Sequence, residues 1–327
     1  MIVIERPRSI NIGSKQMQVP AYFPSISSVK TPMPPAEYLS VLTALEGLND
    51  KYLVSAYDIF PLKDEKYVRD CIAAARVAGR IVLMDSGNYE SFWKENQDRW
   101  KQEDFHSTLD TFSCDLAFGF DEQQPPENED EHVDLVIKRW ELDQRRAGNC
   151  RIVPIVHGSA KTLPSLCRKV AERSGVDFIA VAERRLGDGL IDRARTVGAI
   201  RESLDCLDRY VFLHLLGTGN PISMAVFSLQ GADSFDGLEW CQTVVDHESA
   251  LLFHISQADF FIGQTDWSEA DVPFQMKALA HNLEFYRDWM ARLQRAHTRE
   301  LHIEFCKLNF PERIFRICAV SLGWVKS

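Results

Sequence analysis

The chain has 327 residues, of which 45% are hydrophobic and 26% are charged, a balance typical of a folded globular protein. Its formal net charge of −10 argues against a protein that grips nucleic acid over its whole surface, although a local basic face stays compatible with that charge. No apolar run reaches the roughly 18 to 20 residues that span a bilayer. The start, MIVIERPRS, carries Glu5 and Arg6 where a secretory signal is apolar, so we expect a cytoplasmic protein.

Short apolar runs alternate with helical patterns along most of the chain. The predicted strands are 21–24, 52–55, 80–84, 115–120, 151–156, 177–181, 211–215 and 232–235, of which the first and last are weak. The predicted helices between them are 35–46, 63–78, 102–111, 131–147, 162–173, 191–204 and 222–229. Strands that alternate with helices of this length pair in parallel, and runs such as RIVPIV are apolar enough to be buried on both faces. The pattern predicts an α/β protein with a (β/α)8 TIM barrel, and an open doubly wound sheet is the alternative.

The pattern changes after the last predicted strand. Residues 251–263 are apolar but irregular, 271–296 have the pattern of one long helix, and 310–322 that of a final helix. We expect residues 1–240 to form the barrel with an N-terminal extension. Residues 241–327 then supply the end of the barrel and a C-terminal helical appendage within the same domain.

Polar residues follow the predicted strands at the positions where barrel enzymes carry their chemistry. Asp85, Asp121 and Asp236 each come directly after an apolar run, and His157 follows another. One such aspartate is as often a helix cap or a turn former. Three on one rim need a cationic or proton-sharing partner, or a chemical role. They are therefore the first candidates for an active site.

The contexts of these residues resemble the motifs of the tRNA-guanine transglycosylases, enzymes that swap guanine for a 7-deazaguanine base. The family motif D-S-G-G-[FY]-Q appears as DSGNYE at 85–90, and M-G-x-G-x-P as LGTGNP at 216–221. The further matches, all in family order, are VPAYFP at 19–24 with SVK at 28–30, FDE at 120–122, HGS at 157–159, IAVAE at 179–183, DSFD at 233–236 and HNLEFY at 281–286.

The resemblance implies a pentosyltransferase that works through two displacements. Asp236 would be the nucleophile that attacks C1′ of the target nucleotide, and Asp85 the general acid and base for the departing and incoming bases. Such a reaction retains the anomeric configuration. The resemblance also implies base-binding roles for Tyr89, Leu216, Asp121, His157, Ala182 and Gly217, with Tyr89 and Leu216 sandwiching the base.

Each of these roles has a structural alternative. His157 after a buried strand is often a core histidine, and Tyr89 is compatible with plain packing. Glu183 is equally compatible with a helix cap, and Asp233 is better explained by a turn than by catalysis.

The chain departs from the family at its zinc site and in the base pocket. His281 matches the zinc-binding histidine, but the three cysteines expected some 26 to 31 residues earlier are absent, so we expect no zinc and no other cofactor. A substitute site of Cys241, His247, His254 and His281 would have four ligands of the right type and is the weaker alternative. Without that site we expect His281 to be a packed or capping residue.

The missing cysteines also bear on the substrate, because in the family the zinc region helps to hold tRNA. We expect a relative that acts on DNA, as in the DpdA-type branch, and inserts a base such as 7-cyano-7-deazaguanine. The alternatives are tRNA as substrate, a non-catalytic nucleic-acid-binding paralogue, and an unrelated barrel hydrolase acting on a small nucleoside. A partner ATPase or a homodimer is compatible with the resemblance, and no membrane association is expected.

Overall fold

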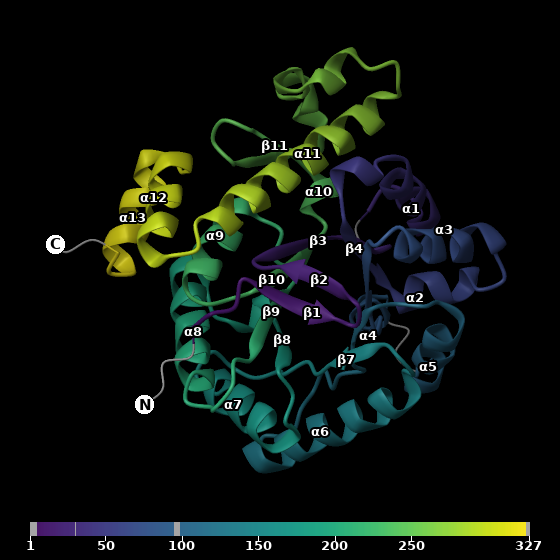
Figure 1. Cartoon of the computed structure of the whole chain (residues 1–327), viewed down its shortest axis with the longest axis vertical. Helices are drawn as coiled ribbons and strands as arrows, with labels where there is room; N and C mark the ends of the chain where they lie inside the picture. Colours follow the sequence, from purple (N-terminus) through teal and green to yellow (C-terminus); the bar gives the residue numbers. More distant parts are fainter. Residues whose placement is uncertain (1–4, 30, 95–98, 325–327) are drawn as a thin grey trace.

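Eight parallel strands form a nearly closed barrel in the computed structural model, which describes residues 5–29, 31–94 and 99–324 (Figure 1). Neighbouring strands pair in chain order, and the last strand pairs with the first. The seam between β7 and β8 is bridged at Ile155 and Ala180, where the Ala180 amide donates to the Pro154 carbonyl at 2.9 Å. The strands are β3 (Ala21–Ile26), β4 (Lys51–Ser55), β5 (Ile81–Asp85), β6 (Leu116–Phe118), β7 (Arg151–Val153), β8 (Phe178–Ala182), β9 (Phe212–Leu216) and β10 (Ser234–Gly237). The (β/α)8 prediction is confirmed, and the open sheet is wrong.

Long helices surround the barrel, and each of the outer helices named at the end of this paragraph overlaps a predicted helix (Figure 1). The polar stretch 122–128 before α6 is a loop that ends at Asn128, whose side chain accepts hydrogen bonds from the backbone amides of Asp130 and Glu131. The outer helices are α1 (Pro35–Ala44), α3 (Lys66–Val77), α5 (Gln102–Thr111), α6 (Glu129–Arg146), α7 (Leu163–Ser174), α8 (Gly189–Leu204), α9 (Pro221–Leu229) and α11 (Phe274–Arg295).

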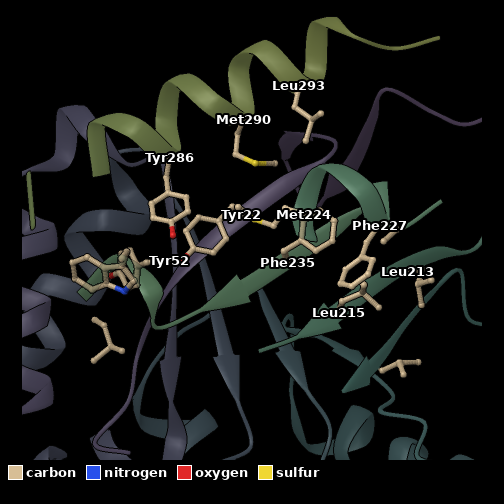
Figure 2. Close-up of a cluster of buried hydrophobic side chains, with 14 of the residues drawn as sticks. Tyr22, Tyr52, Leu213, Leu215, Met224, Phe227, Phe235, Tyr286, Met290 and Leu293 are labelled. Carbon is tan, nitrogen blue, oxygen red and sulfur yellow. The ribbon is translucent and has the colours of Figure 1, made fainter. Parts of the chain in front are cut away.

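Strand alternation divides the core into two apolar layers. Along β9, Phe212 points into the barrel, whereas Leu213 and Leu215 pack outward against the helices. Figure 2 shows part of the outer layer beneath α11, where the rings of Tyr22 and Tyr286 stack with centroids 4.5 Å apart. Full burial of each large apolar side chain contributes about 1.5 to 3 kcal/mol, so this layer gives the strand ends a rigid support.

A hairpin that the sequence did not predict covers the N-terminal end of the barrel. It consists of β1 (Ser9–Ile12) and β2 (Lys15–Gln18), paired antiparallel. Ile10, Ile12 and Met17 are buried in the interior cluster of the barrel. The hairpin therefore closes the end opposite the predicted active-site rim.

The C-terminal part contains more structure than predicted. A second hairpin, β11 (Thr243–Val245) and β12 (Leu252–His254), precedes three short 3-10 turns, η4 (Ile255–Phe260), η5 (Ile262–Gln264) and η6 (Asp266–Glu269). The predicted last helix is present as α13 (Glu312–Ser321), but a separate helix α12 (Arg299–Asn309) lies before it and was missed. Among the described residues, no helix combines the length and apolar character needed to cross a bilayer.

Candidate functional site

A pocket of about 430 Å³ opens at the carboxyl ends of the barrel strands. Its volume lies within the usual range for small-molecule sites. The structure brings together residues as far apart in the chain as Ser25 and Gln242, because the carboxyl ends of parallel strands share one rim. All eight predicted site residues line this pocket, namely Asp85, Tyr89, Asp121, His157, Ala182, Leu216, Gly217 and Asp236.

The carboxylate of Asp236, in β10, is held by donors on both oxygens. Oδ1 accepts from the Gly217 amide at 3.0 Å and from Nε2 of His214 at 3.1 Å. Oδ2 accepts from the Ser25 hydroxyl at 2.8 Å. Gly217 has φ of +75°, a left-handed conformation that glycine adopts without cost and that turns its N–H toward the carboxylate. The side chain is thus fixed in one orientation at the wall of the pocket.

Asp85, at the end of β5, sits in a different environment. Its Oδ2 accepts from the Gly87 amide at 3.1 Å, which holds it at the rim. Burial raises the pKa of Asp85 well above its ordinary range, and the negative charges of Glu90 and Asp121 raise it further. A raised pKa increases the fraction of a carboxyl group that keeps its proton near neutral pH, and a protonated carboxyl group can give that proton to a leaving group.

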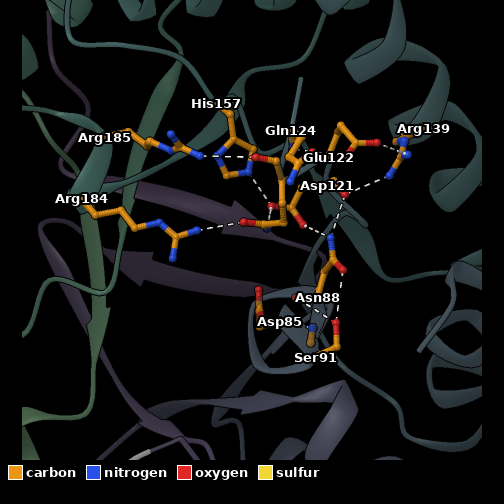
Figure 3. A network of polar contacts seen from close by, with 12 residues as sticks. Asp85, Asn88, Ser91, Asp121, Glu122, Gln124, Arg139, His157, Arg184 and Arg185 are labelled. Atoms are coloured by element: carbon orange, nitrogen blue, oxygen red, sulfur yellow. Dashed lines mark hydrogen bonds and ion pairs between the residues drawn. The ribbon is translucent and has the colours of Figure 1, made fainter. Parts of the chain in front are cut away.

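Asp121, just beyond β6, is the centre of a polar network (Figure 3). Its Oδ2 accepts from Nε2 of His157 and from the side-chain amide of Gln123, both at 2.5 Å. Its Oδ1 accepts from the side-chain amide of Asn88 at 3.0 Å. Burial raises the pKa of Asp121, but the hydrogen bond and charge of His157 and the bond from Asn88 outweigh it, so the pKa is lowered overall. Asp121 therefore remains an acceptor-only group at neutral pH.

An aromatic and apolar surface lies beside this network. Tyr89, in α4 (Asn88–Trp93), is 37% exposed, and Leu216 and Ala182 line the pocket from the ends of β9 and β8. The guanidinium of Arg184 lies over the Tyr89 ring, with 4.5 Å from its Cζ to the centroid, and it donates to Oε1 of Gln123 at 2.9 Å. Arg184 and Gln123 thus join the stacking face of Tyr89 to the carboxylate of Asp121.

Several pocket residues were not predicted from the sequence. Burial raises the pKa of Glu90 to about 7, with a smaller contribution from the charge of Asp58. Burial likewise raises the pKa of Glu239, in α10 (Glu239–Gln242), to about 7. Glu90 could have been suspected, because it stands where the family motif at 85–90 ends in glutamine. Glu239 carried no such signal.

Two other candidates from the sequence have structural contacts. Glu183 lines the pocket, where its carboxylate accepts from Arg193 at 2.8 Å and from Thr218 at 3.2 Å. These two side chains, rather than backbone amides of a helix, are the partners of its carboxylate. Asp233 is fully buried and binds Arg6 and Tyr210, each at 2.8 Å. Asp233 therefore anchors the N-terminal segment through Arg6. Lys30, in the SVK motif at 28–30, lies outside the described residues.

The residues at the expected zinc position do not fit a zinc ion. Nε2 of His281 donates to the Val245 carbonyl at 2.7 Å, and His247 donates to the carbonyl of His281 at 3.1 Å. Nδ1 of His254 is bonded to Ser256, and Cys241 donates to the Leu238 carbonyl. Within residues 5–29, 31–94 and 99–324, no three His, Cys, Asp or Glu side chains are grouped to hold a metal. His281 is a fully buried, hydrogen-bonded core residue.

Comparison with known proteins assigns no family to the chain. No protein-family model matches it, and no curated protein matches it significantly. The case for a function therefore rests on the pocket and on the motifs that line it.

Proposed function

We propose that the protein exchanges guanine in a nucleic acid for a 7-deazaguanine base through a covalent Asp236–sugar intermediate, with DNA as the substrate. The observation that carries this proposal is the pairing of two unlike carboxyl groups in one pocket. Asp236 is oriented by three hydrogen-bond donors, whereas the pKa of Asp85 is raised by burial. Environments that differ in this way suit a nucleophile and a general acid.

The two side chains can divide the reaction between them. In the first step a lone pair of Asp236 forms the bond to C1′, the C1′–N9 bond breaks with its electron pair going to guanine, and Asp85 gives guanine a proton. In the second step Asp85 takes the proton of the incoming base, the freed nitrogen pair forms the bond to C1′, and the pair of the C–O bond returns to Asp236. Asp85 and Asp236 are regenerated, and no further reactant is needed.

The base-binding part of the proposal uses Asp121 and Tyr89. A guanine-like edge presents N–H donors, which suit an acceptor-only carboxylate such as Asp121. In the structure the Gln123 amide already donates to Oδ2 of Asp121 at 2.5 Å, so a base would take the place of that amide. Tyr89 offers a ring face for stacking once the nucleotide has left the duplex, and Leu216 lies on the pocket wall.

DNA is favoured over tRNA because the region that carries the family zinc is replaced here by a hairpin and 3-10 turns held without metal ligands. Arg184 lies at the pocket and contacts Tyr89 and Gln123 rather than a carboxylate, which leaves its charge for a phosphate. The overall charge of −10 fits contacts confined to this rim.

The test is base exchange with labelled guanine in the presence of duplex DNA, single-stranded DNA or tRNA. We expect label in DNA, none in tRNA, and no exchange or covalent adduct with Asp236→Asn. Asp110→Asn, an exposed aspartate in α5, is the matched control and should exchange normally. Label in tRNA alone would overturn the choice of DNA. No exchange with any substrate, even with a partner ATPase supplied, would overturn the catalytic proposal and favour a binding paralogue.

A further inference from the structure

A histidine lies inside the barrel directly below the pocket. His214, in β9, is fully buried and points to the interior, where its ring centroid lies 4.6 Å from that of Phe118 and 6.2 Å from that of Phe23. The interior layer around it is otherwise largely apolar. An imidazole in such a layer is costly to bury unless both nitrogens are hydrogen-bonded.

Both nitrogens of His214 do have partners. Nδ1 lies 2.8 Å from the hydroxyl of Ser234, the residue paired with it across the β9–β10 ladder, and Nε2 lies 3.1 Å from Oδ1 of Asp236. A carboxylate only accepts, so Nε2 must carry the proton in this contact. In a neutral ring Nδ1 then accepts from the Ser234 hydroxyl. The chain Ser234–His214–Asp236 therefore fixes the tautomer of the ring.

The donors on Asp236 are distributed unequally between its two oxygens. Oδ1 receives two hydrogen bonds, from His214 and from the Gly217 amide, whereas Oδ2 receives one, from Ser25. A carboxylate oxygen has two lone-pair sites in its plane. Those of Oδ1 are both occupied, and one site on Oδ2 remains for bond formation.

Resting on the function proposed above, we propose that His214 is a positioning residue that holds Oδ1 of Asp236 and leaves Oδ2 as the attacking oxygen. In the covalent intermediate Oδ2 is bonded to C1′, and Oδ1 becomes the ester carbonyl. His214 and Gly217 still donate to Oδ1 in that state. Their bonds strengthen as the C1′–Oδ2 bond breaks and the electron pair returns to the carboxylate, so His214 assists the second step as well.

The test compares His214→Phe, which keeps a ring but removes both hydrogen bonds, with His214→Gln, whose amide can donate to Oδ1. We expect His214→Phe to lower kcat for exchange by about 100-fold with little change in KM, since loss of one preorganised donor typically costs that much. His214→Gln should recover at least about tenfold of this loss. The control is His302→Phe, because His302 is a buried histidine that donates to Ala225 at 2.9 Å on the outside of the barrel.

An NMR readout keeps the proposal testable if His214→Phe fails to fold. In the wild-type protein, two-bond nitrogen–proton correlations should show the Nε2–H tautomer for His214, and a bare Nε2 would overturn the proposal whether or not exchange occurs. If the wild type exchanges and His214→Phe keeps a rate within twofold of it, the proposal is overturned while the proposed function stands. An equal loss of kcat in His214→Phe and His214→Gln would mean that His214 acts only by packing, which would also overturn the proposal. A wild type that exchanges nothing overturns the proposed function and, with it, the role of Oδ2 as the attacking oxygen.

Discussion

Replacement of the buried Glu90 by glutamine should stabilise the protein increasingly as the pH rises. Glu90 is 4% exposed, its Oε1 accepts from Ser27 at 2.9 Å, and burial raises its pKa from the ordinary 4.5 to about 7. A carboxyl group whose folded-state pKa is raised binds its proton more tightly in the folded state. Its stabilising contribution is complete below pH 4.5 and is lost as the pH rises through 7.

The size of the effect follows from this shift. A rise of about 2.5 pH units corresponds to about 3 kcal/mol between the acid and alkaline limits. Between pH 5.5 and 8.5 the advantage of Glu90→Gln over the wild type should grow by about 2 kcal/mol, since part of the shift has already been titrated at pH 5.5. Any constant offset from the altered Ser27 contact cancels in this difference.

The assay is thermal unfolding of both proteins across this pH range. For a chain of 327 residues the entropy of unfolding is about 0.7 kcal/mol/K, so a change of about 2 kcal/mol should move the difference in Tm by about 3 °C. Glu103→Gln, on the exposed face of α5, is the control and should stay within about 0.5 kcal/mol of the wild type at each pH. A Glu90→Gln difference that is the same at pH 5.5 and 8.5 would refute the idea that this carboxyl group is held neutral by burial.

Three further outcomes follow from the site. Arg184→Ala should tighten the binding of free guanine about two- to fivefold, because the cation–π contact over Tyr89 no longer has to be broken. Calorimetry measures this affinity, and weaker binding would show that Arg184 contacts the base. Gly87→Ala should lower the free energy of unfolding in urea by at least about 2 kcal/mol, because φ of Gly87 is +78° and an added Cβ would lie 2.5 Å from Tyr57. An unchanged free energy of unfolding would mean that the turn can relax. Dialysis against EDTA should leave Tm unchanged, because His281 is bonded to protein atoms, and a fall in Tm would reveal a metal.

The barrel could be predicted because its physical signal is local. Parallel strands covered by helices are buried on both faces, so runs such as 151–156 and 211–215 are almost continuously apolar. The rim followed from the barrel, since residues just after the strands must meet. For this reason Asp85, Asp121 and Asp236 could be grouped in one pocket although they lie far apart in sequence.

Other parts of the site depend on contacts that no local pattern encodes. Ser25 donates to Asp236 across 211 positions of the chain, and nothing around Ser25 distinguishes it from an ordinary strand residue. His214 looks like one polar residue in a buried strand until Ser234 and Asp236 are placed beside it. The two hairpins were missed for a similar reason, because their strands are only three or four residues long.

Many acidic side chains line the pocket, and as carboxylates they would repel the phosphates of the proposed nucleic-acid substrate. Raised pKa values and ion pairs reduce this repulsion. Burial raises the pKa of Asp85 well above its ordinary range and that of Glu90 and Glu239 to about 7, so these groups carry less negative charge at physiological pH than free carboxylates do. Two more carboxylates are paired, Asp121 with His157 and Glu183 with Arg193. The repulsion that a phosphate would meet at this rim is therefore much smaller than the number of carboxyl groups suggests. The burial that raises the pKa of Asp85 thus also lowers the repulsion that the proposed nucleic-acid substrate would meet there. Among the residues that the structure describes, the carboxyl groups that line the pocket are those of Asp85, Glu90, Asp121, Glu183, Asp236 and Glu239.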